Sequence, residues 1–114
     1  MSECLFCKIA AGEIPAKVVF EDEKVVAFED IKPQAPVHIL IIPRKHIPTV
    51  LDLTEEDQEL VGYMYMVANH IAGEKSLAER GFRLVTNCKE SAGQAVFHLH
   101  IHLLGGRKFS WPPG

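Results

Sequence analysis

The chain has 114 residues, of which 47% are hydrophobic, and its formal net charge is −3 with the six histidines neutral. This length fits a single domain over residues 1–114, with a modest core. The absence of any long basic cluster argues against a nucleic-acid partner, and no apolar run approaches the length of about 18 residues that a membrane span requires. The first residues carry no secretion signal, so a cytoplasmic protein is expected.

The N-terminal segment contains Cys4-Leu5-Phe6-Cys7, two thiols at a spacing that is typical of half a zinc site. Such a site needs two more ligands. Outside the dense cluster of histidines near the C-terminus, the candidates are His38, His46 and His70. A redox pair or two buried reduced thiols are alternatives, and a total of three cysteines argues against a disulfide framework.

The middle of the chain predicts short apolar strands and one long helix. Thr54 can cap that helix, and the carboxylates that follow favour its positive N-terminal end. An apolar stripe at helical spacing predicts a buried face, with Met64 and Met66 as filler. We expect helices at residues 5–11 and 54–72, a hairpin from strands 18–20 and 25–28, a loop at 33–36, and further strands at 37–42 and 81–87.

Residues 93–106 hold the most informative pattern in the chain, because histidines alternate with large apolar residues between glycines. Period-two alternation predicts a strand with two different faces. One face carries Val96, His98, His100, His102 and Leu104. The other face, which can enter a core, carries Phe97, Leu99, Ile101 and Leu103.

Two chemistries suit a row of imidazoles. Residues on one face of a strand lie about 6.6 Å apart, so two of these histidines could share a zinc ion but all three could not. Alternatively, a neutral imidazole attacks phosphorus while its neighbour donates hydrogen bonds to the phosphoryl oxygens or to the leaving group. The flanking glycines let backbone N–H groups approach an anion closely.

The run His98-Leu99-His100-Ile101-His102-Leu103-Leu104 resembles the signature of the histidine triad (HIT) family. Residues 103–107 and the terminal Trp111-Pro112-Pro113-Gly114 resemble its Hint branch, the histidine triad nucleotide-binding proteins, and the likeness covers nearly the whole chain. It implies an α+β fold with an antiparallel sheet of about five strands, one long helix and one short helix. It also implies a homodimer that joins two such sheets and brings the terminal tetrapeptide near the partner's site.

The resemblance implies a purine nucleoside phosphoramidase, which cleaves the P–N bond of adenosine or guanosine 5′-phosphoramidates through a nucleotidyl-histidine intermediate and releases AMP or GMP. His100 matches the nucleophile, His102 matches the residue that binds phosphoryl oxygens and passes a proton to the amine, and His38 matches a supporting histidine. Asp30 matches an aspartate that binds the ribose, and a carboxylate can indeed accept two hydrogen bonds from a cis-diol. The other matching nucleotide-binding positions are Phe6, Ile9, Phe28 and Ile31 for the base, and Asn87, Gly93, Gln94 and Ala95 near the phosphate.

The four apolar positions could equally belong to the core, and only the resemblance places them at a base. In relatives that carry the cysteine pair, the resemblance implies a structural zinc site, here Cys4, Cys7, His46 and His98, while the chemistry itself needs no cofactor.

Relatives commonly have Ser or Thr where this chain has Ala95, and that hydroxyl contacts the substrate phosphate or the leaving group. Loss of such a hydrogen bond to a charged group costs about 1.5–3 kcal/mol, or one to two decades in rate. A non-enzymatic nucleotide-binding or scaffold protein is therefore one alternative. A dinucleoside polyphosphate hydrolase, from a related branch of the family, is another.

Overall fold

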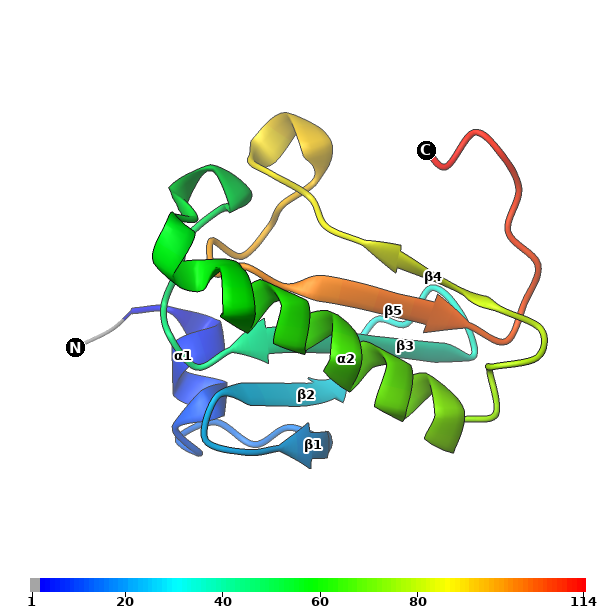
Figure 1. Cartoon of the computed structure of the whole chain (residues 1–114), viewed down its shortest axis with the longest axis horizontal. Coiled ribbons are helices and arrows are strands. Elements are labelled where there is room, and N and C mark those ends of the chain that lie inside the picture. Colours follow the sequence, from blue (N-terminus) through cyan, green and yellow to red (C-terminus); the bar gives the residue numbers. More distant parts are fainter. Residues whose placement is uncertain (1–2) are drawn as a thin grey trace.

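The computed structural model of the chain describes residues 3–114. Met1 and Ser2 lie outside the described residues, and they begin the segment that is expected to lack a secretion signal. A five-stranded sheet has the order β1-β2-β3-β5-β4, and all its neighbouring strands are antiparallel (Figure 1). The strands are β1 (Val18–Glu21), β2 (Val25–Glu29), β3 (Val37–Pro43), β4 (Phe82–Val85) and β5 (Ile101–Gly105). The helices are α1 (Leu5–Ala10) and α2 (Gln58–Glu74). This architecture confirms the expected α+β fold.

Helix α2 lies across one face of the sheet (Figure 1) and covers the main core. A 3-10 turn over Glu55–Asp57 precedes it, and the Asp57 carboxylate accepts hydrogen bonds from the amide and hydroxyl of Thr54. Met64 is fully buried, but Met66 is 62% exposed because it lies on the opposite side of the helix. The prediction that Met66 fills the core is therefore wrong. Nowhere in residues 3–114 is a helix long and apolar enough to cross a membrane.

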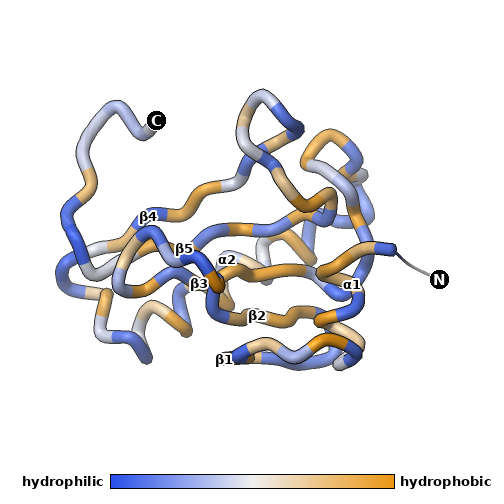
Figure 2. The backbone as a smooth tube through the Cα atoms, turned by 180° about the vertical axis from the view of Figure 1, so that it is seen from behind, coloured by the Kyte–Doolittle hydropathy of each residue, from blue (hydrophilic) through white to orange (hydrophobic). Residues whose placement is uncertain are grey.

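The opposite face of the sheet carries a smaller apolar cluster, which α2 does not cover. Figure 2 shows the sheet from this side, with α1 at one end of the strands. Successive residues of a strand point to opposite faces, so β2 and β3 contribute to both clusters and are buried on both sides. The second cluster consists of Phe6, Val26, Phe28, Leu40 and Ile42.

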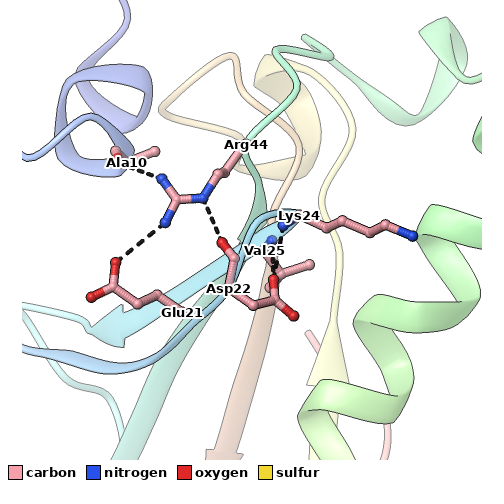
Figure 3. Close-up of polar contacts among 6 residues, drawn as sticks. All are labelled: Ala10, Glu21, Asp22, Lys24, Val25 and Arg44. Carbon is pink, nitrogen blue, oxygen red and sulfur yellow. Dashed lines mark hydrogen bonds and ion pairs between the residues drawn. The ribbon is translucent and has the colours of Figure 1, made fainter.

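Arg44, directly after β3, ties the end of α1 to the turn between β1 and β2 (Figure 3). Its guanidinium donates to the carbonyls of Ala10 at 2.6 Å and Asp22 at 2.7 Å and to the carboxylate of Glu21 at 3.2 Å. The hydroxyl of Tyr63 on α2 donates to the carboxylate of Asp22. These contacts hold the short helix, the hairpin and the long helix in one arrangement.

The strand predicted from residue 96 begins only at Ile101. The chain bends before it, and the N–H of His98 bonds the carbonyl of Val96 at 2.9 Å instead of a strand partner. The bend leaves Phe97 45% exposed, so the prediction that this side chain enters the core is wrong. Strand β4 is likewise shorter than the predicted 81–87, because its ladder with β5 ends at Val85.

Candidate functional site

A groove of about 1100 Å³ opens on the face of the sheet that α2 leaves uncovered. This volume is ample for a nucleotide-sized ligand. Its apolar side includes Ile31, which is 92% exposed and has no core to enter. The groove brings together most residues predicted to bind a nucleotide, namely Phe6, Ile9, Phe28, Asp30, Ile31, Gly93, Ala95, His100 and His102.

Gln94 and Asn87 are the two predicted nucleotide-binding residues that do not line the groove. The buried side chain of Gln94 accepts a hydrogen bond from the Lys89 amide at 2.7 Å and donates one to the Pro48 carbonyl at 2.8 Å. Gln94 thereby holds its loop to the neighbouring segment. The Asn87 amide nitrogen lies 3.8 Å from where a Cβ on Gly93 would stand, and Gly93 has a φ of 97°, which favours glycine. Asn87 therefore lies behind the glycine that borders the groove.

His100 is a buried imidazole with a fixed proton position. Its Nδ1 lies 2.7 Å from the carbonyl oxygen of His98. A carbonyl oxygen can only accept a hydrogen bond, so in the neutral ring Nδ1 carries the proton and Nε2 keeps its lone pair. Burial lowers the pKa of His100, which keeps the ring neutral at pH 7. An imidazole held in this state can act as a nucleophile through Nε2.

His38 and His102 face each other beside the carboxylate of Asp30. The Nε2 of His38 lies 3.0 Å from the Nδ1 of His102 and 3.4 Å from Asp30 Oδ2. Burial lowers the pKa of His38, and burial together with the adjacent His100 and His38 lowers the pKa of His102 to about 4. Both rings are therefore neutral at pH 7, and their facing nitrogens share one proton. The three groups also have the proximity that a metal site would require.

Cys4, Cys7, His46 and His98 converge in a second cluster, within 4.8 Å of one another. The Nδ1 of His98 lies 3.3 Å from the Cys4 sulfur and 3.2 Å from the Nδ1 of His46, and the latter lies 3.3 Å from the Cys7 sulfur. A tetrahedral zinc ion with bonds of about 2.0–2.3 Å would separate its ligand atoms by about 3.3–3.8 Å. The Nε2 of His98 lies 2.7 Å from the Pro43 carbonyl, which leaves the lone pair on Nδ1 for a metal. The donor set fits such an ion.

Helix α1 joins this cluster to the groove. The Cys4 sulfur caps the helix by accepting a hydrogen bond from the Cys7 amide. Between the two cysteines, the ring of Phe6 packs edge-on against Phe28 and His100, with centroids 5.4 and 5.1 Å apart. The short helix and its N-cap residue therefore carry two of the candidate ligands and an aromatic wall of the groove.

A family model of the HIT domain matches residues 11–109. The chain belongs to the HIT family. It is 50% identical over 115 residues to an uncharacterized HIT-like protein of Synechococcus elongatus, and the match covers 100% of both chains. The structure of a HIT family hydrolase from Legionella pneumophila is 55% identical, with a TM-score of 0.97 over 98% of this chain and 100% of that one. A histidine triad nucleotide-binding protein from Candida albicans is 30% identical, with a TM-score of 0.83 over 98% and 85% of the two chains.

The site of this HIT protein also contains residues that sequence analysis did not single out. Lys17 and Lys32 line the groove, and Pro43 orients His98 through its carbonyl. No sequence signal marks Pro43, because a backbone carbonyl has the same chemistry in every residue. The two lysines could have been found only by placing the segments that contain them, before β1 and after β2, next to the groove.

Proposed function

We propose that this HIT protein is a purine nucleoside phosphoramidase, which cleaves the P–N bond of nucleoside 5′-phosphoramidates. The observation that carries the proposal is the neutral His100, whose Nε2 lone pair is left for a ligand in a groove that His102 also lines. The two rings lie 5.0 Å apart between centroids. The choice of a P–N bond rests on the resemblance of residues 103–107 and 111–114 to the Hint branch.

The reaction proceeds in two displacements. The Nε2 of His100 attacks phosphorus and forms a new N–P bond, while the bond to the amine breaks and its electron pair leaves on the amine nitrogen. His102, which is neutral at pH 7, donates a hydrogen bond to the phosphoryl oxygens, and the leaving amine takes up one proton from solvent water. The proton released in the second displacement neutralises the hydroxide that this leaves. A water molecule then attacks the nucleotidyl-histidine and gives up a proton, and the bonding pair returns to Nε2 as AMP or GMP leaves. His38 supports these two histidines through its contact with His102.

The groove offers a place for each part of such a nucleotide. Phe6, Phe28 and the exposed Ile31 supply apolar surface for the purine, beside Ile9. Asp30 accepts a hydrogen bond from the backbone amide of residue 32 through Oδ1, and the remaining lone pairs of its carboxylate suit the ribose diol. The backbone beside Gly93 and Ala95 borders the position for the phosphate.

We also propose that Cys4, Cys7, His46 and His98 hold a structural zinc ion. Four protein ligands close a tetrahedral site, so no open position remains for a reacting water. The bound ion would cross-link helix α1 to the segment that leads into β5, and the chemistry of His100 would not use it. Metal loss should therefore act through stability.

The Hint resemblance further suggests a homodimer that joins two sheets, and two features support it. Strand β4 lies at the edge of the sheet among the described strands, and Tyr65 and Met66 are exposed apolar side chains of α2. The chain after β5 leaves on the β4 side (Figure 1), and Trp111 in it is 82% exposed. Its terminal tetrapeptide would then approach the partner's groove. Sedimentation equilibrium tests the assembly, because a monomer at micromolar concentration would exclude it.

Hydrolysis of adenosine 5′-phosphoramidate, compared with diadenosine triphosphate, tests the proposed reaction. Faster release of AMP from the phosphoramidate is the expected result. A preference for diadenosine triphosphate would instead indicate a dinucleoside polyphosphate hydrolase. Binding of AMP without turnover of either compound would indicate a nucleotide-binding or scaffold protein, an outcome favoured by Ala95, which lines the groove without a hydroxyl.

A further inference from the structure

We infer that the backbone amide of Gln34, held in place by Arg107, sets the proton positions of the His38–His102 pair so that His102 carries its proton on Nε2. Both Gln34 and Arg107 lie outside the lining of the groove, so each acts as a positioning residue. The inference rests on the proposed function for the catalytic use of His102. The proton positions themselves can be measured without it.

The first step is the contact between Gln34 and His38. The backbone N–H of Gln34 points at the Nδ1 of His38 across 3.0 Å. A backbone amide nitrogen can only donate, so Nδ1 must accept through its lone pair. The imidazole is buried, and a protonated Nδ1 would bring two protons face to face. In its neutral form, His38 therefore carries its proton on Nε2.

The second step passes this assignment to His102. The Nε2–H of His38 has two acceptors in reach, the Nδ1 of His102 at 3.0 Å and Asp30 Oδ2 at 3.4 Å. Since the Nδ1 of His102 accepts, the proton of this second neutral ring lies on its Nε2. The groove is then lined by a lone pair on His100 Nε2 and by a proton on His102 Nε2, which are the nucleophile and the donor that the reaction needs.

The third step concerns the placement of the Gln34 peptide. Arg107 follows β5, and its Nε donates to the carbonyl of Gln34 at 3.0 Å. The guanidinium stacks on the ring of Phe109 at 4.2 Å from the centroid. The preceding Gly106 has a φ of 90°, and a Cβ there would come within 2.9 Å of Pro36. The segment after β5 therefore presses on the 33–36 loop and fixes the amide that faces His38.

The same proton positions decide what the Asp30–His38–His102 cluster can do. A metal ion would need a lone pair on the Nε2 of His38, which the contact with Gln34 denies it. The cluster is therefore an arrangement for a proton, despite ligand atoms close enough for a metal.

Nitrogen-15 NMR of the full-length, histidine-labelled protein at neutral pH tests the assignment directly. Long-range proton–nitrogen correlation distinguishes protonated from unprotonated ring nitrogens, and His38→Gln and His102→Gln identify the signals. We expect an unprotonated Nδ1 and a protonated Nε2 in both rings. A proton on the Nδ1 of either ring in the wild-type protein would overturn the inference, whatever reaction the protein catalyses.

Two substitutions at one position isolate the amide. Gln34→Pro removes the N–H, whereas Gln34→Ala keeps it and is the matched control. We expect a protonated Nδ1 on His38 to become populated in Gln34→Pro only. A shift that leaves about 1–10% of the molecules with the proton on the Nε2 of His102 should lower kcat about 10- to 100-fold, while KM changes less than about threefold. Unchanged proton positions in a folded Gln34→Pro protein would refute the role of the amide.

Arg107→Ala provides the second test, and it also serves if Gln34→Pro does not fold. It leaves the amide in the chain but removes the group that holds it, so we expect mixed protonation of His38 and a loss in kcat of about three- to tenfold. Unaltered NMR signals and kinetics would exclude Arg107 as the anchor. A wild-type protein with the expected proton positions but no phosphoramidase activity would contradict only the proposed function.

Discussion

Acid should destabilise the fold through His102 before most carboxylates are protonated. Burial and the adjacent His100 and His38 lower the pKa of His102 from 6.5 to about 4. Between these values the unfolded chain binds a proton that the folded chain does not, so stability is complete above pH 6.5 and falls as the pH decreases toward 4. The full difference corresponds to on the order of 3 kcal/mol, of which on the order of 2 kcal/mol is lost by about pH 5.

Urea unfolding at about pH 7.5 and pH 5 measures this loss, and His102→Asn is the control because it cannot titrate in this range. Loss of zinc from the proposed site in acid would affect both proteins, so the difference between their pH dependences isolates His102. The wild type should lose on the order of 2 kcal/mol more than the variant over this interval. Equal pH dependences for the two proteins would refute the reasoning.

Three further predictions concern the groove, the proposed zinc site and the core. Ala95→Ser, which adds the hydroxyl that the Hint resemblance implies at this position, should raise kcat for a phosphoramidate by about 10- to 100-fold; an unchanged rate would mean that the hydroxyl has no part in this site. Cys4→Ser should lower both the zinc content and the Tm, and a protein with full zinc occupancy would exclude Cys4 as a ligand. Met64→Ala should cost about 2–5 kcal/mol in urea unfolding and Met66→Ala less than about 0.5 kcal/mol, and similar costs would contradict the placement of these side chains.

The order of the elements could be predicted from the sequence because each carries a local signal. The capping residues around Thr54 and the apolar stripe after it indicate α2, and its long-range packing follows from that stripe. The prediction from the alternating pattern was wrong at Phe97. The pattern indicates which face a side chain would occupy in a strand, but it does not indicate where strand pairing begins. Met66 was assigned to the core from its residue type, although helical spacing puts it two residues after Met64 and therefore on the opposite side of the helix.

The side chains of the site were easier to predict than the atoms that orient them. The density of histidines from His98 to His102 indicates chemistry by itself, and the resemblance places Asp30 and His38 beside them. The proton positions depend on backbone groups, such as the carbonyl of Pro43 and the amide of Gln34. Any residue type offers these groups, so they become visible only when the loops are placed in space.

A single-turnover reaction of adenosine 5′-phosphoramidate with the wild-type protein and with His100→Ala tests the central claim most directly. The account predicts rapid release of AMP by the wild type alone and a trapped nucleotidyl-histidine when the reaction is quenched early. The His100→Ala protein should fold and bind AMP without turnover. Substantial turnover by His100→Ala, with contamination excluded, would contradict the assignment of the nucleophile, and no release by either protein would contradict the proposed reaction.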